Sequence, residues 1–485
     1  MTHDQLLAAS GNAGWMLMSA SLVLLMTPGL ALFYGGMSGR RSALNMMMMS
    51  VGAMAVVPVI YVLWGWSASY GGGDLGGIVG NPLQTFGLRG EIMDSNGDFI
   101  AGDSGYPRIV DIGFQVTFAI IAVAIISGAL AGRVKFGAWL AFVAGWVTLA
   151  YFPIAHMVWD GGLLSESENS IAAWLFGTTG EEASVAPVDF AGGTVVHISA
   201  GAAALVLALY VGARKDFPTK VDKPHNLPMV MLGTALLWFG WYGFNGGSAF
   251  AADGMAGLAW MNTTVATAAA MLGWMAVEAV RDKAATSLGA ASGAVAGLVT
   301  ITPAAGALTP VTSIPLGALG GVIACLAIGL KYRFGFDDSL DVVGVHLCAG
   351  LWGTVGLALV ADGRGILNGH AGEGLKLLVV QVCIALVALL VSGLVTLLLA
   401  VLIGATIGWR VSEAEEHDGI DLAQHRESAY DISEAGGKTQ PLMRPLPEAP
   451  LAAPGIQQSG PQQPGPAQPV SRKRSRRQRQ QRSKS

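Results

Sequence analysis

The chain has 485 residues and a formal net charge of −4, and only 12% of its residues are charged. Its mean hydropathy is +0.53. Average soluble chains carry about 25% charged residues, so this composition is that of a membrane protein. The acidic balance excludes a basic nucleic-acid-binding protein, and three cysteines are too few for a disulfide-rich secreted domain.

Eleven stretches are apolar over about the 20 residues that a helix needs to cross a membrane. In chain order they are residues 14–37, 44–66, 111–131, 136–159, 190–212, 228–249, 257–279, 287–304, 312–332, 341–361 and 377–409. We therefore expect an all-α polytopic membrane protein with eleven transmembrane helices. No Lys or Arg precedes Arg40, so a cleaved signal peptide is not expected.

The distribution of positive charge predicts the orientation in the membrane. Twelve Lys and Arg residues follow or flank the odd-numbered spans, whereas only four follow the even-numbered spans. The positive-inside rule then places the N-terminus outside and the C-terminus in the cytoplasm of a multi-pass cell-membrane protein. The predicted outer loop 160–189 contains six carboxylates and no Lys or Arg. Together these charges would concentrate cations at the outer face, although each one alone reads as an ordinary solvated side chain.

Ionisable residues inside membrane spans are costly and usually mark function. Three histidines fall within the predicted spans: His156, His197 and His346. Two of them share a context, since Asp189 precedes His197 by eight residues and Asp338 precedes His346 by eight, with valines before each His. A single intramembrane His is often only packed against a neighbouring carbonyl, but the matched pair favours a functional role. His156 has no counterpart and is interpreted as structural.

The two matched histidines lie in spans five and ten, which end two consecutive blocks of five spans. An odd block size forces the second block to run inverted. Transporters built from such inverted repeats have their binding site near the bilayer midplane, where the repeats meet. This spacing predicts a 5+5 inverted repeat followed by a final helix, with His197 and His346 meeting at the centre.

Aromatic residues gather at the predicted outer ends of three spans. Phe118 lies in span three, Trp159 ends span four, and Phe244 and Ser248 lie near the end of span six. Ring faces attract an ammonium-type cation, and a serine hydroxyl can accept a hydrogen bond from it. The alternative is an aromatic belt that faces lipid headgroups. On composition alone, the lipid-facing belt is the favoured interpretation.

Taken together, these strings resemble the ammonium transporter family (Amt/Mep, with the Rhesus proteins as distant relatives). The resemblance covers residues 15 to about 430. It is carried by residues 189–214, Phe33-Tyr34-Gly35-Gly36, Phe114-Gln115-Val116-Thr117-Phe118, Ala155-His156-Met157-Val158-Trp159, Gly243-Phe244-Asn245-Gly246-Gly247-Ser248, Thr302-Pro303 and Asp341-Val342-Val343-Gly344-Val345-His346.

The resemblance implies a homotrimer in which each protomer has its own narrow hydrophobic pore, with no enzymatic activity and no cofactor. It also implies a role for each matched residue. Trp159, Phe118 and Ser248 would form the external ammonium site, and Phe118 and Phe244 would form the gate. His197 and His346 would line the pore, and Asp189 would be a chiefly structural carboxylate near the outer site.

The implied function is selective transport of ammonium or ammonia, with methylammonium as an analogue. A dry pore makes any bare ion costly, because charge in a low-dielectric medium is heavily penalised. Ammonium can lose its proton and cross as neutral ammonia, whereas potassium cannot. A pair of imidazoles can accept hydrogen bonds from the solute and relay the proton, since the basicity of imidazole is readily tuned.

The chain divides into a spanning domain (1–409), a cytoplasmic tail motif (410–430) and a Pro- and Gln-rich tail (431–485) that is predicted to be disordered. The tail motif resembles the segment through which PII-type signal proteins close the pore. Eight of the last fourteen residues are Lys or Arg, so the terminus either contacts anionic lipid or is simply solvated.

Three positions depart from the family pattern. Gly132 stands where Glu is usual, Leu347 follows His346 where Gly is usual, and Arg426 replaces a Gly in the tail motif. Two other functions stay open. One is an ammonium sensor with a transporter-like body, and the other is a membrane metal site that uses His156, His197 and His346.

Overall fold

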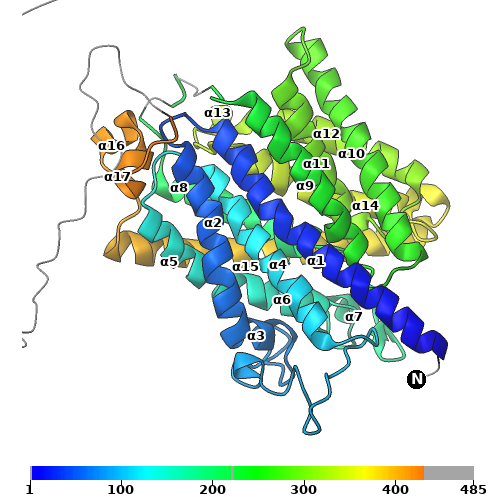
Figure 1. Cartoon of the computed structure of the whole chain (residues 1–485). Helices are drawn as coiled ribbons and strands as arrows, with labels where there is room; N and C mark the ends of the chain where they lie inside the picture. The colour runs from blue at the N-terminus through cyan, green and yellow to red at the C-terminus, as the bar shows by residue number, and fades with distance from the viewer. Residues whose placement is uncertain (1–2, 216, 220–222, 431–485) are drawn as a thin grey trace, which may run out of the picture. The chain divides into compact units, whose positions relative to one another are not determined.

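The computed structural model describes residues 3–215, 217–219 and 223–430 (Figure 1). The predicted disordered tail, residues 431–485, lies outside the described residues. Within the described residues, eleven helices are long and apolar enough to cross a membrane. The prediction of an all-α protein with eleven spans is therefore confirmed, and the protein is embedded in a membrane.

The first five spans are assembled from helices that often run on from one another through π-helical or 3₁₀ turns. Their bounds are α1 (His3–Met37); α2 (Ala43–Ile60), η1 (Tyr61–Gly65) and α3 (Trp66–Tyr70); α4 (Arg108–Ile126) and η3 (Ser127–Leu130); α5 (Phe136–Trp146), η4 (Val147–Tyr151) and α6 (Phe152–Trp159); and η5 (Gly193–Ile198) and α8 (Ser199–Val211).

The next six spans complete the helical body. Their bounds are α9 (Leu227–Gly247); α10 (Gly254–Arg281); α11 (Ser287–Ile301) and η6 (Thr302–Ala304); α12 (Pro310–Ala327) and α13 (Leu330–Phe334); η7 (Val343–Cys348) and α14 (Ala349–Val360); and α15 (Ala371–Thr406).

Short elements occupy the loops and the tail segment. They are η2 (Phe86–Leu88), α7 (Ile171–Phe176), β1 (Thr178–Thr179), β2 (Glu182–Ala183), η8 (Ile366–Asn368), α16 (Glu413–Asp418) and α17 (Ile420–His425). The two strands pair antiparallel. The start of α1 lies on the same side of the helical body as α3 and α7, and α16 and α17 lie on the opposite side (Figure 1). We name the α3 side the outer face and the α16 side the inner face, after the orientation that the charge distribution predicts.

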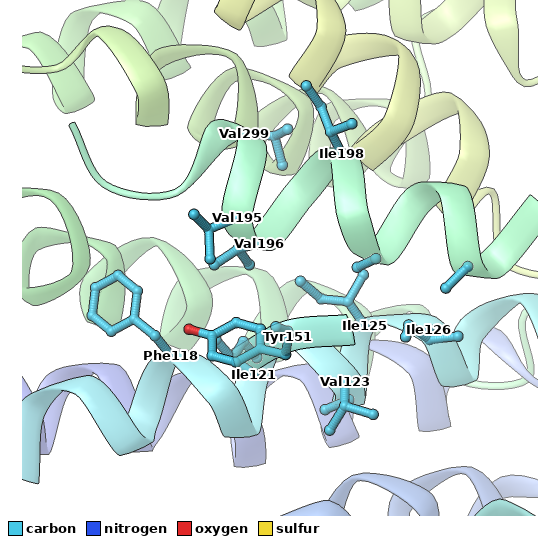
Figure 2. Packing of buried hydrophobic residues seen from close by; sticks show 14 of the residues in the cluster. Phe118, Ile121, Val123, Ile125, Ile126, Tyr151, Val195, Val196, Ile198 and Val299 are labelled. Carbon is cyan, nitrogen blue, oxygen red and sulfur yellow. The ribbon is translucent and has the colours of Figure 1, made fainter. Parts of the chain in front are cut away.

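The centre of the body is closely packed around α4 and η5. Figure 2 shows Ile121 and Ile125 of α4 near Val195 and Val196 of η5, and none of the four side chains is more than 2% exposed. By contrast, α15 presents large apolar side chains outward, such as Leu394, which is 65% exposed. Outward apolar side chains face lipid in a membrane protein, so the polar and functional groups are expected in the interior.

Candidate functional site

A cavity of about 490 Å³ opens at the outer face. The three residues predicted for the external site, Phe118, Trp159 and Ser248, all line it. The aromatic side chains therefore face a cavity inside the protein and are not a lipid-facing belt. The long loop between α3 and α4 supplies further lining residues, among them Glu91 and Asp103.

The geometry of this cavity fixes the orientation of its polar and aromatic groups. The rings of Phe118 and Trp159 meet edge to face, with centroids 6.0 Å apart. The indole Nε1–H of Trp159 donates to the backbone carbonyl of Asp189 at 3.0 Å, which holds the ring in place. The Ser248 hydroxyl donates to the carbonyl of Phe244 at 2.8 Å. Its oxygen lone pairs are therefore free to accept a hydrogen bond from a cation in the cavity.

Below the cavity, two phenylalanine rings form a stack. Phe118 and Phe244 lie nearly parallel with centroids 4.2 Å apart, and their side chains are 1% and 0% exposed. Phe114 packs edge-on against Phe118 at 4.8 Å. On its other side Phe244 is close to His197 and Trp241, with ring centroids 6.1 and 5.4 Å away. A continuous line of rings therefore leads from the outer cavity to the buried histidine.

His197 and His346 meet in the interior, as the repeat pattern predicted. Their Nδ1 atoms lie 3.3 Å apart, and the side chains are 0% and 3% exposed. When both rings are neutral, one Nδ1 must carry a proton and donate, while the other Nδ1 accepts. The two imidazoles are then opposite tautomers. The rings that stack on His197, Trp241 and Phe244, are buried as well, so the pair lies in the closed interior of the protein.

The Asp that precedes each His has the same structural task in both motifs. Its carboxylate accepts hydrogen bonds from the first backbone N–H groups of the π-helical segment that carries the His. The donors are Gly192, Thr194 and Val195 to Asp189, and Val342 and Val343 to Asp338, at 2.7 to 3.1 Å. Helix N-termini favour negative charge at this position. The repeated spacing in the sequence is thus that of a cap which fixes the start of each His-bearing helix.

Both capping carboxylates are buried, which affects their protonation. Burial raises the pKa of Asp189 to about 6, although the backbone N–H groups oppose the shift. Burial, followed by the nearby charge of Asp341, raises the pKa of Asp338 to about 7. The Asp189 carboxylate accepts three backbone hydrogen bonds, and Asp189 is not among the residues that line the outer cavity. Its backbone carbonyl accepts the hydrogen bond that positions Trp159.

His156 lies apart from the other two intramembrane histidines. Its Nδ1 contacts Asp160 at 3.1 Å and the Ser69 carbonyl at 3.3 Å, and its Nε2 contacts Asp74 at 3.0 Å. These bonds tie the end of α6 to the outer loop. In the part of the chain that the structure describes, no group of three His, Cys, Asp or Glu residues could hold a metal ion.

Trp241 belongs to the site, although sequence analysis gave it no role. Its indole stacks on His197, with centroids 5.4 Å apart and planes at 18°, and its Nε1–H donates to Thr302 Oγ1 at 2.9 Å. Trp241 lies one helical turn before Phe244, so both face the same path. This three-residue spacing from Phe244 is the sequence feature that could have indicated Trp241. The Thr302-Pro303 motif contributes to the site because Thr302 accepts the hydrogen bond that holds the indole.

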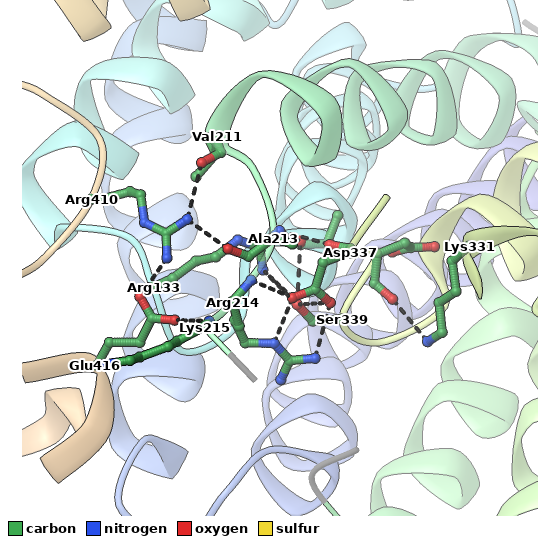
Figure 3. A network of polar contacts seen from close by, with 12 residues as sticks. Arg133, Val211, Ala213, Arg214, Lys215, Lys331, Asp337, Ser339, Arg410 and Glu416 are labelled. Carbon is green, nitrogen blue, oxygen red and sulfur yellow. Dashed lines mark hydrogen bonds and ion pairs between the residues drawn. The ribbon is translucent and has the colours of Figure 1, made fainter. Parts of the chain in front are cut away.

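A network of buried charges lies at the inner face (Figure 3). Arg133 is fully buried and donates to the carbonyls of Ala129 and Asp337 and to Ser339. The Asp337 carboxylate accepts two hydrogen bonds from the Arg214 guanidinium, at 2.7 and 3.0 Å. Burial alone would raise the pKa of Asp337, but the two arginines outweigh it and hold that pKa below its usual value.

The tail segment is docked against the inner ends of α2 and α5. Asp421 accepts hydrogen bonds from the backbone N–H groups of Leu44 and Asn45, at 3.1 and 2.8 Å, and so caps α2. His425 Nε2 contacts Asn45 Oδ1 at 3.0 Å, and its ring packs against Phe136 at 5.0 Å. A second cavity, of about 380 Å³, is lined by Lys331 and Asp341 together with Glu416 and His417 of α16. The tail segment therefore lines part of this inner-face cavity.

The structure shows the surroundings of Leu347 and the backbone conformation of Arg426, two of the positions that depart from the family pattern. Leu347 packs directly on Gly201 of α8, where an added Cβ would come within 2.6 Å of Leu347 Cβ. Arg426 follows α17 with a φ of 57°, in the left-handed region that favours glycine. The tail thus keeps the left-handed backbone with a residue that is strained in it.

Eleven spans, a buried line of aromatic rings and an interior imidazole pair define a polytopic membrane transport protein. A model of the ammonium transporter family matches residues 14–430. The chain belongs to the ammonium transporter family, as its motifs predicted.

Similar proteins agree with this assignment. An ammonium transporter of Mycobacterium tuberculosis is 49% identical over 454 residues, which covers 89% of this chain and 92% of that protein. An ammonium transporter of Aquifex aeolicus is 42% identical over 430 residues, which covers 87% of this chain and 94% of that protein. Among solved structures, Saccharomyces cerevisiae Mep2 superposes with a TM-score of 0.71 at 30% identity, covering 83% of this chain and 90% of that one. A protein described as a sensor Amt protein superposes with a TM-score of 0.75 at 26% identity, covering 86% of this chain and 99% of that one.

Proposed function

We propose that the protein transports ammonium by binding it in the outer cavity, removing its proton, and passing ammonia between Phe118 and Phe244 to the histidine pair. The observation that carries this proposal is the unbroken series of ring contacts from Trp159 through the phenylalanine stack to His197 and His346. Family membership supports ammonium transport, and the proposal adds the route and the residue roles.

In the first step, ammonium binds over the aromatic rings of Trp159 and Phe118, and Ser248 accepts one of its N–H groups. A cation over an aromatic face is stabilised by about 0.5 to 2 kcal/mol. The edge-to-face contact of the two rings and the hydrogen bond from Trp159 to the Asp189 carbonyl keep this site in shape without the cation. Asp189 acts as a positioning residue, through its cap and its carbonyl.

In the second step, the closed stack selects against ions that cannot lose a proton. Moving a bare charge into a low-dielectric interior is heavily penalised. Ammonium avoids this penalty by transferring its proton to water in the outer cavity, while potassium has no neutral form. The stack of Phe118 on Phe244 acts as the gate, and it opens only enough for a small neutral molecule.

In the third step, the histidine pair receives the ammonia. One Nδ1 donates and the other accepts, so the pair shares a proton that can shift between the rings. Ammonia can accept a hydrogen bond from one imidazole N–H or donate to a free ring nitrogen. His197 Nε2 has no partner among the described residues, which leaves it available on the path. The same pair provides a route for the proton that was separated from ammonium.

We further propose a homotrimer in the cell membrane, with the N-terminus outside and the C-terminus in the cytoplasm. The tail segment 410–430 regulates the inner mouth and is the docking site for a PII-type signal protein. The contacts of Asp421 with the start of α2 support a tail that is coupled to the spans. Glu416 and His417 line the inner cavity, so a displaced α16 would change the exit.

An ammonium sensor is the second function that the fold permits, because one structural neighbour is described as a sensor Amt protein. That neighbour is 26% identical to this chain, whereas the ammonium transporter of Mycobacterium tuberculosis is 49% identical. Transport is therefore favoured. A metal site is not supported, since His156 bonds to Asp74 and Asp160 instead of joining the pair.

The test is to record current and solute uptake in proteoliposomes under separate gradients of ammonium, methylammonium and potassium. We expect ammonium and methylammonium to be carried and potassium to be excluded. Liposomes in which the protein is a folded trimer but carries neither ammonium nor methylammonium would contradict the proposal and favour the sensor.

A further inference from the structure

The outer cavity continues above the aromatic site along one face of α4. Asp111, Gln115 and Phe118 occupy successive turns of this helix, and all three line the cavity. Residues spaced by four and three positions lie above one another on a helix, and four residues correspond to about 6 Å along its axis. Polar groups are therefore stacked directly outside the phenylalanine that begins the gate.

Gln115 is buried but its amide oxygen is unsatisfied. The side chain is only 8% exposed, and no donor among the described residues reaches Oε1. Buried acceptors without a donor are costly and rare, and each one calls for an explanation. Because Gln115 lines the cavity, a solute with N–H groups in that cavity can supply the missing donor.

Asp111 differs from the other carboxylates around the cavity. Glu91 is paired with Arg108 at 2.9 Å, and Asp160 bonds to His156 at 3.1 Å. Asp111 has no ion pair within the described residues. Its Oδ1 accepts a hydrogen bond from the Tyr106 hydroxyl at 2.5 Å, which fixes the carboxylate. Asp103 also lines the cavity but is exposed, so its charge is screened by water.

We propose that the Asp111 carboxylate and the Gln115 amide oxygen form a holding site for an ammonium-type cation, outside the aromatic site. The carboxylate supplies the countercharge and the amide oxygen accepts an N–H, a combination that raises the occupancy of the aromatic site at low concentration. This inference rests on the proposed transport function. It assigns substrate contacts to two residues beyond Trp159, Phe118 and Ser248.

The test is the concentration dependence of methylammonium uptake in proteoliposomes that contain Asp111→Asn or Gln115→Leu. The amide in Asp111→Asn can still accept from Tyr106, so the loop contact is retained. We expect the half-saturating concentration to rise at least about fivefold in each variant, with the maximal rate within about twofold of the unsubstituted protein. Asp98→Asn is the matched control, because it removes the same charge from an exposed position of the same loop that does not line the cavity.

Unchanged half-saturation in both variants would overturn the holding site. An equal rise in Asp98→Asn would also overturn it, since the effect would then come from the general field of the loop. Tyr106→Phe separates structure from binding: it removes the hydrogen bond but keeps the charge, and we expect less than about a twofold change.

Equilibrium binding of radiolabelled methylammonium to the purified trimer distinguishes this inference from the proposed function. If the unsubstituted protein binds methylammonium but carries none, the transport proposal fails, and weaker binding by Asp111→Asn and Gln115→Leu still supports the site. If the unsubstituted protein transports while both variants bind and transport normally, only the holding site fails.

Discussion

The Nδ1 atoms of His197 and His346 lie 3.3 Å apart, although 149 residues separate the two histidines in the chain. Each ring is carried by a π-helical segment, η5 or η7, that an aspartate caps from eight residues upstream. A π-helix has a wider turn than an α-helix and is often found at functional sites. The two caps and the two wide turns bring the Nδ1 atoms of the imidazoles into contact.

The first prediction follows from that contact. In His197→Ala or His346→Ala, ammonium-driven current should fall by at least about 100-fold, which is the contribution typical of a positioned acid–base group. The reason is that one remaining imidazole has no partner with which to share a proton. The measurement is current in proteoliposomes under equal ammonium and potassium gradients, with trimer integrity checked in parallel. Normal, selective current in both variants would mean that the pair is only structural.

Much of the fold follows from the sequence because the membrane imposes length and polarity on every span. The eleven spans can be predicted from the lengths of the apolar stretches alone. The repeated Asp-to-His spacing indicated the two helices that carry His197 and His346. The pairing of spans into inverted repeats stays a prediction. The ends of the spans also shifted: α1 begins at His3, and α3 continues the second span to Tyr70.

The polar lining of the outer cavity could not be predicted from the sequence, because it depends on how the loop between α3 and α4 packs. Nothing in residues 67–110 indicated that Glu91 would pair with Arg108, or that Tyr106 would bond to Asp111. Likewise, Trp241 is recognisable as a neighbour of His197 only after the two spans have been packed together. Contacts between distant segments have no local signature in composition or periodicity.

The second prediction concerns the gate. Phe244→Ala should abolish selective transport or make it leaky, because the ring that stacks on Phe118 at 4.2 Å is removed. Truncating a buried Phe typically costs about 3 to 5 kcal/mol of stability, so folding must be tested as well. Phe142→Ala is a matched control, since Phe142 is equally buried but packs against Trp139 and Trp409, away from the line of rings. Full, selective transport by folded Phe244→Ala protein would exclude a gating role.

The third prediction concerns the aromatic site. Trp159→Leu should raise the half-saturating concentration of methylammonium uptake by about two- to thirtyfold, which corresponds to a cation–π energy of about 0.5 to 2 kcal/mol. The maximal rate should change less, since Phe118 and Ser248 remain. An unchanged concentration dependence would show that the indole has no part in binding the cation.

The fourth prediction concerns the charge network at the inner face. Asp337→Asn should lower the free energy of unfolding in detergent by about 3 to 5 kcal/mol, because Arg133 is left buried without its counter-charge. The pKa of Asp337 is depressed in the folded state, so its stabilisation is present above the unfolded pKa of about 3.9 and is lost as the pH falls further. The difference between the two proteins should therefore shrink in acid.

The control for this variant is Asp282→Asn, which breaks the exposed pair of Arg281 and Asp282. Exposed ion pairs contribute little, so its unfolding midpoint should not move. Equal midpoints for Asp337→Asn and the unsubstituted protein at neutral pH would contradict the assigned role of the network.

The fifth prediction concerns the tail. Arg426 holds a left-handed backbone with a φ of 57°, a conformation that costs a residue with a Cβ about 1 to 2 kcal/mol. Glycine removes this strain but loses more entropy on folding, about 0.5 to 1 kcal/mol. In Arg426→Gly the tail should therefore dock more tightly, and hydrogen exchange at the amides of Leu44 and Asn45, which donate to Asp421, should slow by about two- to fivefold. Lys283→Gly is the matched control: its φ is 62°, but it lies in the loop after α10 and should leave those two amides unchanged. Faster exchange in Arg426→Gly would show that the arginine side chain itself holds the tail in place.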